Sequence, residues 1–536
     1  MPQFSDDSLQ TLSFGHLQEV VAIDSQSDEH SDAIPSSDGQ RILAELVAKR
    51  FEACGASVER DPFANVIATF PGRGAGIGAP TIALLVHLDT ARGTSNPHHL
   101  NIVRAWDGSA VPYPDNAAIK VDVATYPGLA EFVGQDVVHG GGVTPFGLDD
   151  KLGLTHLLTL ARVLAADPSL AHPPLLLIGR PDEEIGRMEA VEGLAVLLAA
   201  RGVRSGYTVD GILPFEVNVQ NFNGAHATAS WQGQAFDAAT LEHHCAALTV
   251  HLGGVNTHGA TAFDEGHRAA TRFAAEILAR AGSLVVPVAF DSDAVRDCDA
   301  VLVVRLHPDG AAAFETIVAD VVTPHIARGA SFSIGPIGSQ VLASGPAHDG
   351  VQRLFAAVSA FAESRAPAAA KGDTAVPTER DLPLWAEDSR GWQGYSHPYR
   401  ARTSASGAEL DVRIRDFVPA DLEVRKAHIR ASFSASGATV TDRDQYVNMG
   451  PRLADRRDLV DLALAAGADV GVACREQPIR GGTGVDPFLE RGTAIANLGT
   501  GYFAPESEKE LTSLSLMAHH VRWLVALLAR LAAVRA

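Results

Sequence analysis

Apolar residues recur at helical spacing over residues 40–54, and two short apolar runs follow, VIATF at 66–70 and TIALLV at 81–86. The same order of helix-like and strand-like segments returns later, at 152–165, 174–179 and 190–202. A period of three to four residues predicts helices, and short unbroken apolar runs predict strands buried on both faces. The alternation therefore predicts an α/β fold with a mostly parallel sheet flanked by helices.

The pattern changes at about Phe222, where polar and apolar residues begin to alternate in strand-like segments such as ALTVHLGG and VLVVRLH. Such segments, separated by amphipathic helices, are typical of an α+β domain whose sheet is exposed on one face. From about Tyr446 the α/β pattern returns and ends in a long apolar helix. We therefore expect an α/β domain formed by 1–222 and 446–536, with an α+β domain inserted at 223–445.

The expected insert contains an internal similarity. Residues 301–334 and 410–441 share the order strand, turn, helix, Gly-Ala and strand. One interpretation is that the insert is a duplicated unit with two similar halves. The other is that any two pieces built from a strand, a helix and a strand resemble each other at this level of detail.

Composition and charge limit the possible functions. The chain has 536 residues, 46% hydrophobic and 20% charged, which predicts a globular protein of several domains. Its net charge of −21 opposes binding to nucleic acid or to an anionic membrane surface. No apolar run reaches the roughly 18 residues that span a bilayer, and the acidic N-terminus lacks the pattern of a signal peptide. We expect a cytoplasmic protein with no nucleic-acid or membrane partner.

The first candidate site residues follow a predicted buried strand. The motif HLDT places His87 and Asp89 directly after TIALLV, at the carboxyl end of a strand, where open α/β sheets bind ligands. Residues two apart on a strand share a face, so Asp89 is suited to fix the imidazole tautomer of His87 for a metal. Taken alone, the pair is more typical of a structural histidine.

Three acidic motifs occur at comparable positions: GLDDKLG with Asp149, PDEEIG with Glu183 and Glu184, and YTVDG with Asp210. Each motif alone is typical of a helix cap or a solvated turn. Together with His87 they are expected to meet at one edge of one sheet. Carboxylates with a single imidazole suit divalent cations such as zinc, manganese or cobalt, and two such ions require a bridging carboxylate.

Eight motifs in this order, HLDT, GLDDKLG, PDEEIG, YTVDG, QNFNGA, IRDF, YVNM and PIRGGT, resemble the peptidase T branch of the dinuclear zinc metallo-exopeptidases. That family includes tripeptide aminopeptidases, carboxypeptidase G and aminoacylase-like amidohydrolases. The resemblance implies a catalytic α/β domain with an inserted lid domain, two divalent metal ions and short peptides as substrates. Zinc is the expected metal, with manganese and cobalt as alternatives.

The resemblance also implies roles for the residues in these motifs. His87 and Asp210 are expected to hold one ion, Asp149 to bridge, and Glu184 to hold the other ion. Glu183 is expected to act as the general base, taking a proton from a metal-bridging water and returning it to the leaving amine.

Three further residues match the family in motifs outside the metal cradle. His258 in GVNTHG corresponds to a lid histidine that stabilises the oxyanion and often comes from the other subunit of a dimer. Arg415 in IRDF and Arg480 in PIRGGT correspond to arginines suited to a substrate carboxylate. The alternative roles are a histidine in a surface loop and arginines in structural ion pairs.

The sequence departs from the family near its end. Relatives have a final metal-binding histidine where this chain reads TGYFAPESEKEL, which places Glu506 at that position. If Glu506 is a ligand, the second ion has only oxygen ligands and should favour manganese or cobalt more than an imidazole site would. Alternatively, Glu506 only caps a loop, or His519 or His520 from the last helix replaces the missing ligand.

We therefore expect a dinuclear metal-dependent exopeptidase, an aminopeptidase that releases the N-terminal residue of tripeptides. A dipeptidase, a carboxypeptidase and an N-acyl amino acid amidohydrolase are alternatives on the same scaffold. A catalytically silent peptide-binding protein is an alternative of another class. A duplicated lid would allow an active monomer in place of a homodimer, because the second half could take the place of the partner's lid.

Overall fold

The computed structural model describes residues 4–292, 298–336, 348–364, 366–367 and 379–534. The chain divides into two compact units, here called unit 1 and unit 2. Unit 1 consists of residues 1–117, 121–221 and 448–536, and unit 2 of residues 118–120 and 222–447. The chain thus leaves unit 1 after Asn221 and returns to it at Asn448, next to the boundaries expected from the sequence.

Unit 1 is built around a sheet in the order β1-β2-β6-β3-β7-β20-β8-β19. Its four central strands run parallel, and they are β6 (Leu175–Arg180), β3 (Ile82–His87), β7 (Ser205–Gly211) and β20 (Ala494–Gly499). The outer strands are β1 (Ser57–Arg60), β2 (Val66–Phe70), β8 (Glu216–Asn218) and β19 (Arg475–Glu476). β1, β2 and β8 pair antiparallel with their inner neighbours. The expected α/β fold is confirmed: the sheet has a parallel centre, and antiparallel pairs occur towards its edges.

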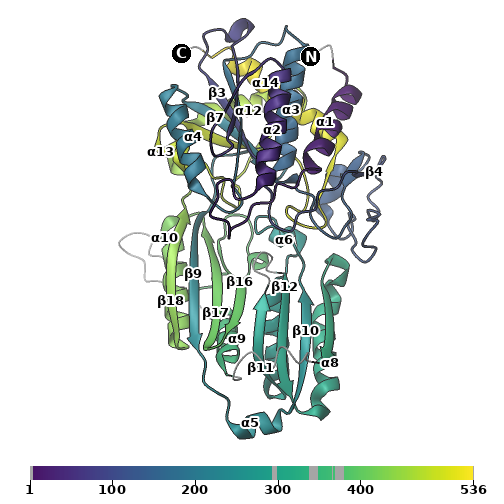
Figure 1. Cartoon of the computed structure of the whole chain (residues 1–536), viewed down its shortest axis with the longest axis vertical. Helices are drawn as coiled ribbons and strands as arrows, with labels where there is room; N and C mark the ends of the chain where they lie inside the picture. Colours follow the sequence, from purple (N-terminus) through teal and green to yellow (C-terminus); the bar gives the residue numbers. More distant parts are fainter. Residues whose placement is uncertain (1–3, 293–297, 337–347, 365, 368–378, 535–536) are drawn as a thin grey trace. The chain divides into compact units, whose positions relative to one another are not determined.

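Helices pack on this sheet in unit 1 (Figure 1). They are α1 (Asp6–Val21), α2 (Asp38–Ala53), α3 (Leu148–Ala166), α4 (Met188–Ala200), α12 (Arg457–Asp469), α13 (Asp486–Glu490) and α14 (Leu514–Leu531). α1, α3 and α14 pack against one another, and α12 packs on α14. α3 is apolar on nearly all sides and almost entirely buried, as expected for a helix enclosed by the sheet and other helices. A small sheet of β4 (Asn101–Val103), β5 (Val137–His139) and β21 (Leu511–Ser513) completes the unit.

Unit 2 contains two four-stranded antiparallel sheets (Figure 1). The first has the order β11-β12-β10-β13 and the second β16-β17-β9-β18. The strands of the first are β10 (Ala246–Gly253), β11 (Val285–Ser292), β12 (Asp299–Leu306) and β13 (Ser331–Pro336). The strands of the second are β9 (Asn223–Gln232), β16 (Tyr395–Ser404), β17 (Gly407–Asp416) and β18 (Ala438–Tyr446). Shorter elements of this unit are α5 (Ala238–His243) and α6 (Ala262–Glu265).

The two sheets belong to halves with the same topology. The first half runs β10-α7-β11-β12-α8-β13, with α7 at Ala270–Ala281 and α8 at Ala311–Val322. The second half runs β9-α9-β16-β17-α10-β18, with α9 at Gly350–Ala362 and α10 at Pro419–Ala435, and the first half is inserted after β9. The register shifts at corresponding places, between Pro287 and Ala289 in one half and between Pro398 and Arg400 in the other. The internal similarity in the sequence thus corresponds to two halves of one topology.

The halves meet along β11 and β16, which are corresponding edge strands. The Phe290 amide donates to Thr403 Oγ1 at 2.8 Å, and the Ala401 amide donates to Ser292 Oγ at 2.8 Å. One hydrophobic core runs through both halves, with Phe290 among its residues. Unit 2 is therefore a single packed body built from two similar parts. Within the described residues, no helix is long and apolar enough to cross a membrane.

A buried histidine pair in unit 1 couples the fold to pH. The rings of His156 in α3 and His520 in α14 stack with centroids 4.9 Å apart. His156 Nε2 lies 2.9 Å from the Thr500 carbonyl oxygen, to which it donates. Burial lowers the pKa of His156 to about 4, so the ring is neutral in the folded protein near pH 7.

We predict that replacing this histidine with glutamine makes the protein less sensitive to acid. Between pH 6.5 and 4 the unfolded chain binds a proton at His156 that the folded chain does not bind, so stability falls as pH falls. The shift corresponds to about 3 kcal/mol of unfolding free energy. Urea unfolding at pH 7 and pH 4.5 should show a smaller loss for His156→Gln than for wild type. The exposed control His30→Gln should lose as much as wild type, and an equal loss in all three proteins would contradict the prediction.

Candidate metal centre

The candidate site lies at the carboxyl ends of the parallel strands of unit 1. Six side chains that the sequence singled out lie there: His87 at the end of β3, Glu183 and Glu184 after β6, Asp210 in β7, Glu506 after β20, and Asp149 at the start of α3. The carboxyl ends of parallel strands share one edge of a sheet, which is where open α/β folds bind ligands. The topology therefore brings together residues that are more than 400 positions apart in the sequence.

The first group of possible ligands consists of His87, Asp149 and Asp210. His87 Nε2 lies 3.1 Å from Asp149 Oδ1 and 3.4 Å from Asp210 Oδ1. His87 Nδ1 lies 2.9 Å from the carbonyl oxygen of Asp89, to which it is placed to donate. This hydrogen bond leaves Nε2, on the side of the two carboxylates, as the atom available to a cation.

The second group consists of Asp149, Glu184 and Glu506. One ligand atom from each of the three side chains lies within 4.8 Å of the other two. Asp149 belongs to both groups, which is the position of a bridging carboxylate between two cations. Asp149 departs from helical dihedral angles, with φ −87° and ψ 109°, so it stands apart from the regular part of α3.

Asp89 contacts both His87 and the loop after β6. Its carboxylate lies 3.4 Å from His87 Nδ1, and its main-chain oxygen lies closer, at 2.9 Å. The carboxylate also accepts hydrogen bonds from the amides of Glu183 and Glu184, at 2.9 and 3.1 Å. The side chain of Asp89 therefore fixes the loop after β6 against the end of β3, while its carbonyl group orients the imidazole.

The electrostatics of the site fit divalent cations. Burial raises the pKa of Asp210 to about 7, and burial together with the charges of Glu506 and Asp149 raises the pKa of Glu184. Although burial opposes it, the nearby carboxylates raise the pKa of His87. Glu184 Oε1 is buried and has no hydrogen-bond partner among the described residues. A buried carboxylate oxygen that receives no hydrogen bond is costly unless a cation neutralises it. Several carboxylates close together also provide the oxygen ligands that hard or borderline cations require.

Glu183 differs from its neighbour Glu184. It belongs to neither group of possible ligands, and its Oε1 lies 3.4 Å from Nη2 of Arg180. The backbone of Gly484 approaches this pair closely, because a Cβ atom there would lie 2.5 Å from Arg180 Nη2 and 2.9 Å from Glu183 Oε1. Gly484 also has a φ of +56°, which favours glycine. The two adjacent glutamates thus have separate environments, one among the ligand groups and one beside an arginine.

Buried carboxylates that the sequence analysis did not identify hold the site in place. Glu510 Oε2 accepts hydrogen bonds from the amides of Phe146 and Gly147 at 2.8 and 2.9 Å, next to Asp149. Glu510 Oε1 accepts from the Glu506 amide at 3.1 Å. Glu510 thus joins the segments that carry two of the possible ligands. Its position four residues after Glu506 was the only sequence signal that could have identified it.

Three other supporting residues were also missed. The Tyr502 hydroxyl donates to Asp149 Oδ2 at 3.0 Å, and the His87 amide donates to Asp150 Oδ2 at 3.2 Å. Asp182, directly before Glu183, accepts hydrogen bonds from the Ser36 amide and from Gln40 Nε2, at 2.8 and 2.7 Å. These contacts join segments far apart in the sequence, and no local pattern indicates them.

The remaining predicted residues lie outside the two ligand groups. His258 follows β10 in unit 2, where its Nδ1 accepts from the Ala260 amide at 3.1 Å. Arg415 lies on β17 of unit 2, and Arg480 lies in unit 1 before α13. His520 is buried between His156 and Phe215, and its Nδ1 bonds the Leu516 carbonyl, so it serves packing and not metal binding.

Known proteins resemble the chain over nearly its whole length. A peptidase T of Exiguobacterium sibiricum is 26% identical over 528 residues, covering 96% of this chain and 97% of the relative. A peptidase T of Macrococcus caseolyticus is 24% identical over 499 residues, covering 90% of each. No protein-family model matches the chain.

Solved structures show the same fold. A tripeptidase of Staphylococcus aureus has a TM-score of 0.52 at 14% identity, covering 98% of this chain and 99% of the other. An aminopeptidase PepT of Bacillus cereus has a TM-score of 0.50 at 16% identity, with the same coverage. The full-length relatives and the shared fold agree with the two ligand groups at the strand ends, and together they support the peptidase T branch of the metallo-exopeptidases for this chain.

Proposed function

We propose that this metallo-exopeptidase is an aminopeptidase that releases the N-terminal residue of short peptides, with tripeptides as the first class to test. The observation that carries the proposal is the pair of ligand groups that share Asp149, with Glu183 next to but outside them. The full-length relatives named peptidase T support the tripeptide substrate. They do not favour a dipeptidase, a carboxypeptidase or an amidohydrolase, and the two ligand groups do not favour a silent binding protein.

The proposal gives each group one cation. His87 and Asp210 would hold one, Glu184 and Glu506 the other, and Asp149 would bridge them. Two bound divalent cations would polarise the scissile carbonyl and lower the pKa of the attacking water. The imidazole suits zinc in the first group, whereas the all-oxygen second group suits manganese or cobalt as well.

Glu183 would act as the general base. Its carboxylate is about one-fifth exposed and lies beside the Arg180 guanidinium, so it can face a substrate while Glu184 faces the ligand group. It would accept a proton from the attacking water and return it to the leaving amine when the peptide bond breaks. Asp89 would keep Glu183 in position through the hydrogen bond to its amide.

Unit 2 and Arg480 would contribute to substrate binding. We assign His258 to stabilisation of the oxyanion of the tetrahedral intermediate, and Arg415 and Arg480 to substrate carboxylate groups. Arg415 lies over the Tyr446 ring, with Cζ 5.1 Å from the centroid, and Nη1 donates to the Ala225 carbonyl at 3.1 Å. These contacts hold the guanidinium in a defined place on β17.

The two similar halves of unit 2 support an active monomer over an obligate homodimer. Corresponding edge strands of the halves meet within one chain, so the chain supplies two lid-like halves without a partner.

We also propose that the enzyme acts in peptide catabolism in the cytoplasm. Its four cysteines, all within the described residues, form no disulfide, which fits a reducing compartment.

We predict that Glu183→Gln abolishes most peptide hydrolysis and leaves the metal content unchanged. Loss of a general base typically lowers turnover by 10²–10⁴-fold, and glutamine preserves the shape of the side chain. Tripeptide turnover and metal analysis of the same preparation measure both quantities. Glu192→Gln, an exposed position on α4, is the control and should behave as wild type. Unchanged turnover of Glu183→Gln would contradict the assignment of the base.

We predict that Glu506→Ala lowers the bound metal from two equivalents towards one, because the second group loses one of its three donors. Glu506→His should restore the second equivalent and shift the preference from manganese towards zinc. Metal titration followed by elemental analysis gives both results. The exposed α2 variant Glu52→Ala serves as the control. Two full equivalents in Glu506→Ala would show that Glu506 is not a ligand.

We predict that the monomer is fully active. Sedimentation velocity and tripeptide turnover measured at the same protein concentrations should show activity proportional to monomer concentration. If turnover instead rises only with the dimer fraction, the second half of unit 2 does not replace a partner.

A further inference from the structure

The exposed face of the second sheet of unit 2 carries an ordered set of cationic side chains. Strand register places Arg413 on β17, His226 on β9 and Arg443 on β18 opposite one another in one row across the sheet. The next row contains Arg415 and Tyr446, on either side of Gly224. Residues two apart on a strand share a face, so Arg413 and Arg415 lie on the same side about 7 Å apart along β17.

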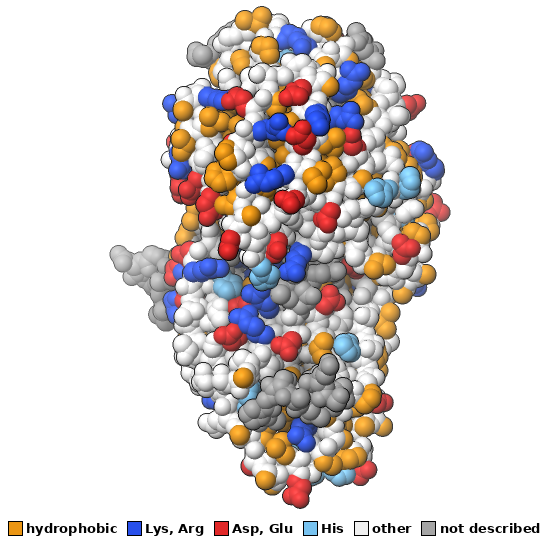
Figure 2. All heavy atoms as spheres, viewed as in Figure 1, with side chains coloured by type: hydrophobic (Ala, Val, Ile, Leu, Met, Phe, Trp, Pro, Cys, Tyr) orange, Lys and Arg blue, Asp and Glu red, His pale blue; other side chains and the backbone are white. Residues whose placement is uncertain are grey.

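Positive charge exceeds negative charge on this face. The described strands place five arginines there against two carboxylates, and these residues are Arg400, Arg402, Arg413, Arg415, Arg443, Glu409 and Asp411. Figure 2 shows Lys and Arg side chains, with histidine and acidic ones, gathered over these strands. Asp442 and Asp444 of β18 lie on the opposite face of the sheet, where they pair with Arg430 and Lys426 of α10. A surplus of this kind is unexpected in a chain of net charge −21.

Neighbouring side chains hold the arginines in place. Asp411 Oδ2 accepts from Arg400 Nε at 2.9 Å and from Arg402 Nη1 at 3.2 Å. Arg413 lies over the Tyr399 ring, with Cζ 4.2 Å from the centroid. Burial lowers the pKa of His226, and the charges of Arg443 and other arginines lower it further against the effect of Asp411. The guanidinium groups of Arg400, Arg402 and Arg413 therefore have fixed neighbours before any ligand arrives, which reduces the entropy cost of binding.

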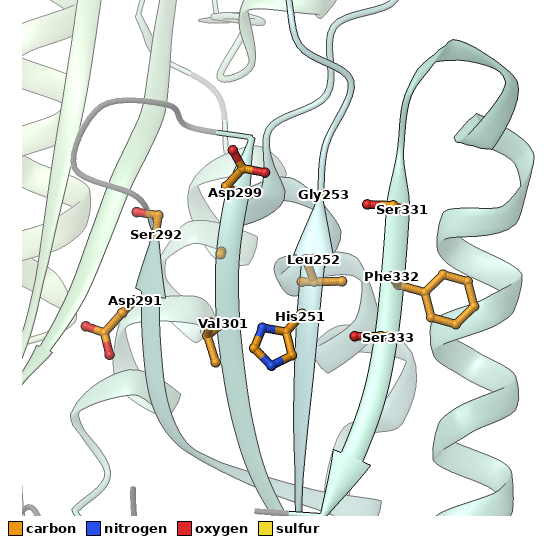
Figure 3. Close-up of a pocket in the computed structure, with 11 residues that line it drawn as sticks. His251, Leu252, Gly253, Asp291, Ser292, Asp299, Val301, Ser331, Phe332 and Ser333 are labelled. Carbon is orange, nitrogen blue, oxygen red and sulfur yellow. The ribbon is translucent and has the colours of Figure 1, made fainter. Parts of the chain in front are cut away.

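The corresponding face of the first half has the opposite character. Register aligns Asp291, Val301 and His251 in one row there. Figure 3 shows these residues on one face of the first sheet with Asp299, Ser331 and Ser333, around a hollow above Gly253. The carboxylates of Asp291 and Asp299 at this hollow would repel an anion. The cationic face is thus a property of the second half and not of the repeated topology.

We propose that Arg413 and Arg443 form an anion subsite beside Arg415, which binds the side-chain carboxylate of peptides that end in glutamate or aspartate. The proposal rests on the function proposed above, in which Arg415 takes a substrate carboxylate. The spacing of the two rows suits the two carboxylates of one acidic C-terminal residue, and a planar guanidinium binds a carboxylate through two parallel hydrogen bonds.

Single-stranded RNA is the other class of ligand that binds to sheet faces carrying arginine and aromatic residues. Sheet faces that bind RNA use open aromatic rings to stack bases. Here Arg413 covers Tyr399 and Arg415 lies over Tyr446, so guanidinium groups already occupy these rings. This arrangement favours carboxylates over bases.

The test compares Ala-Ala-Glu with its neutral isostere Ala-Ala-Gln as substrates of the metal-loaded enzyme. Wild type should show a kcat/KM for Ala-Ala-Glu that is about tenfold above that for Ala-Ala-Gln, through a lower KM. The double variant Arg413→Gln, Arg443→Gln should lose this preference, since one charge-assisted hydrogen-bonded pair is worth about tenfold. The ratio compares two substrates of one preparation, so it does not depend on the folded fraction.

Arg280→Gln is the matched control, because Arg280 is an exposed arginine on α7 in the helical layer of the same unit. It should retain the preference. Equal use of both peptides by wild type, or a preference that survives in the double variant, would overturn the proposal. If neither peptide is hydrolysed, the proposed function fails. Calorimetric titration of the full chain with the same two peptides then still decides the subsite, and tighter binding of an oligouridine than of Ala-Ala-Glu would overturn it.

Discussion

The repulsion between buried carboxylates at one sheet edge dominates the chemistry of unit 1. Asp149, Asp210, Glu184 and Glu506 approach one another within two overlapping groups, with only one imidazole among them. Two like charges at 4 Å repel by about 4 kcal/mol at an effective dielectric constant of 20. Burial, together with the charges of Asp149 and Glu183, raises the pKa of Asp210 to about 7, so that protons bind to the site in the absence of cations. Divalent cations would replace those protons and neutralise the carboxylates, so this arrangement of side chains favours metal binding.

The fold maintains this unfavourable arrangement through neutral donors around it. Main-chain amides supply much of the support: those of Glu183 and Glu184 bind Asp89, and those of Phe146 and Gly147 bind Glu510. These contacts join the end of β3 to the loop after β6, and the segment before α3 to the segment after β20, so the candidate ligands are held in place without a cation. In a preorganised site of this kind, the repulsion between the carboxylates would be relieved when cations bind, because the surrounding structure prevents the side chains from moving apart.

Much of this site could be predicted from the sequence because one physical rule connects its parts. Polar residues directly after buried strands meet at a common edge, and this rule predicts that His87, Glu184 and Asp210 lie together. The rule does not identify Glu510 or Asp182, because their hydrogen-bond partners lie in segments far away along the chain. The repeat in unit 2 was visible in the sequence, but the nesting of one half after β9 was not. Nesting depends on the pairing of β9 with β17, about 180 residues apart along the chain, and local patterns do not record such pairing.

The central claim is that this sheet edge binds two cations that share Asp149. Anomalous X-ray diffraction from crystals of the metal-loaded protein, collected above and below the absorption edge of the metal, tests it most directly. The account predicts two anomalous peaks per chain, one beside His87 and Asp210 and one beside Glu184 and Glu506, with Asp149 between them. A single peak, or peaks away from these residues, would contradict it.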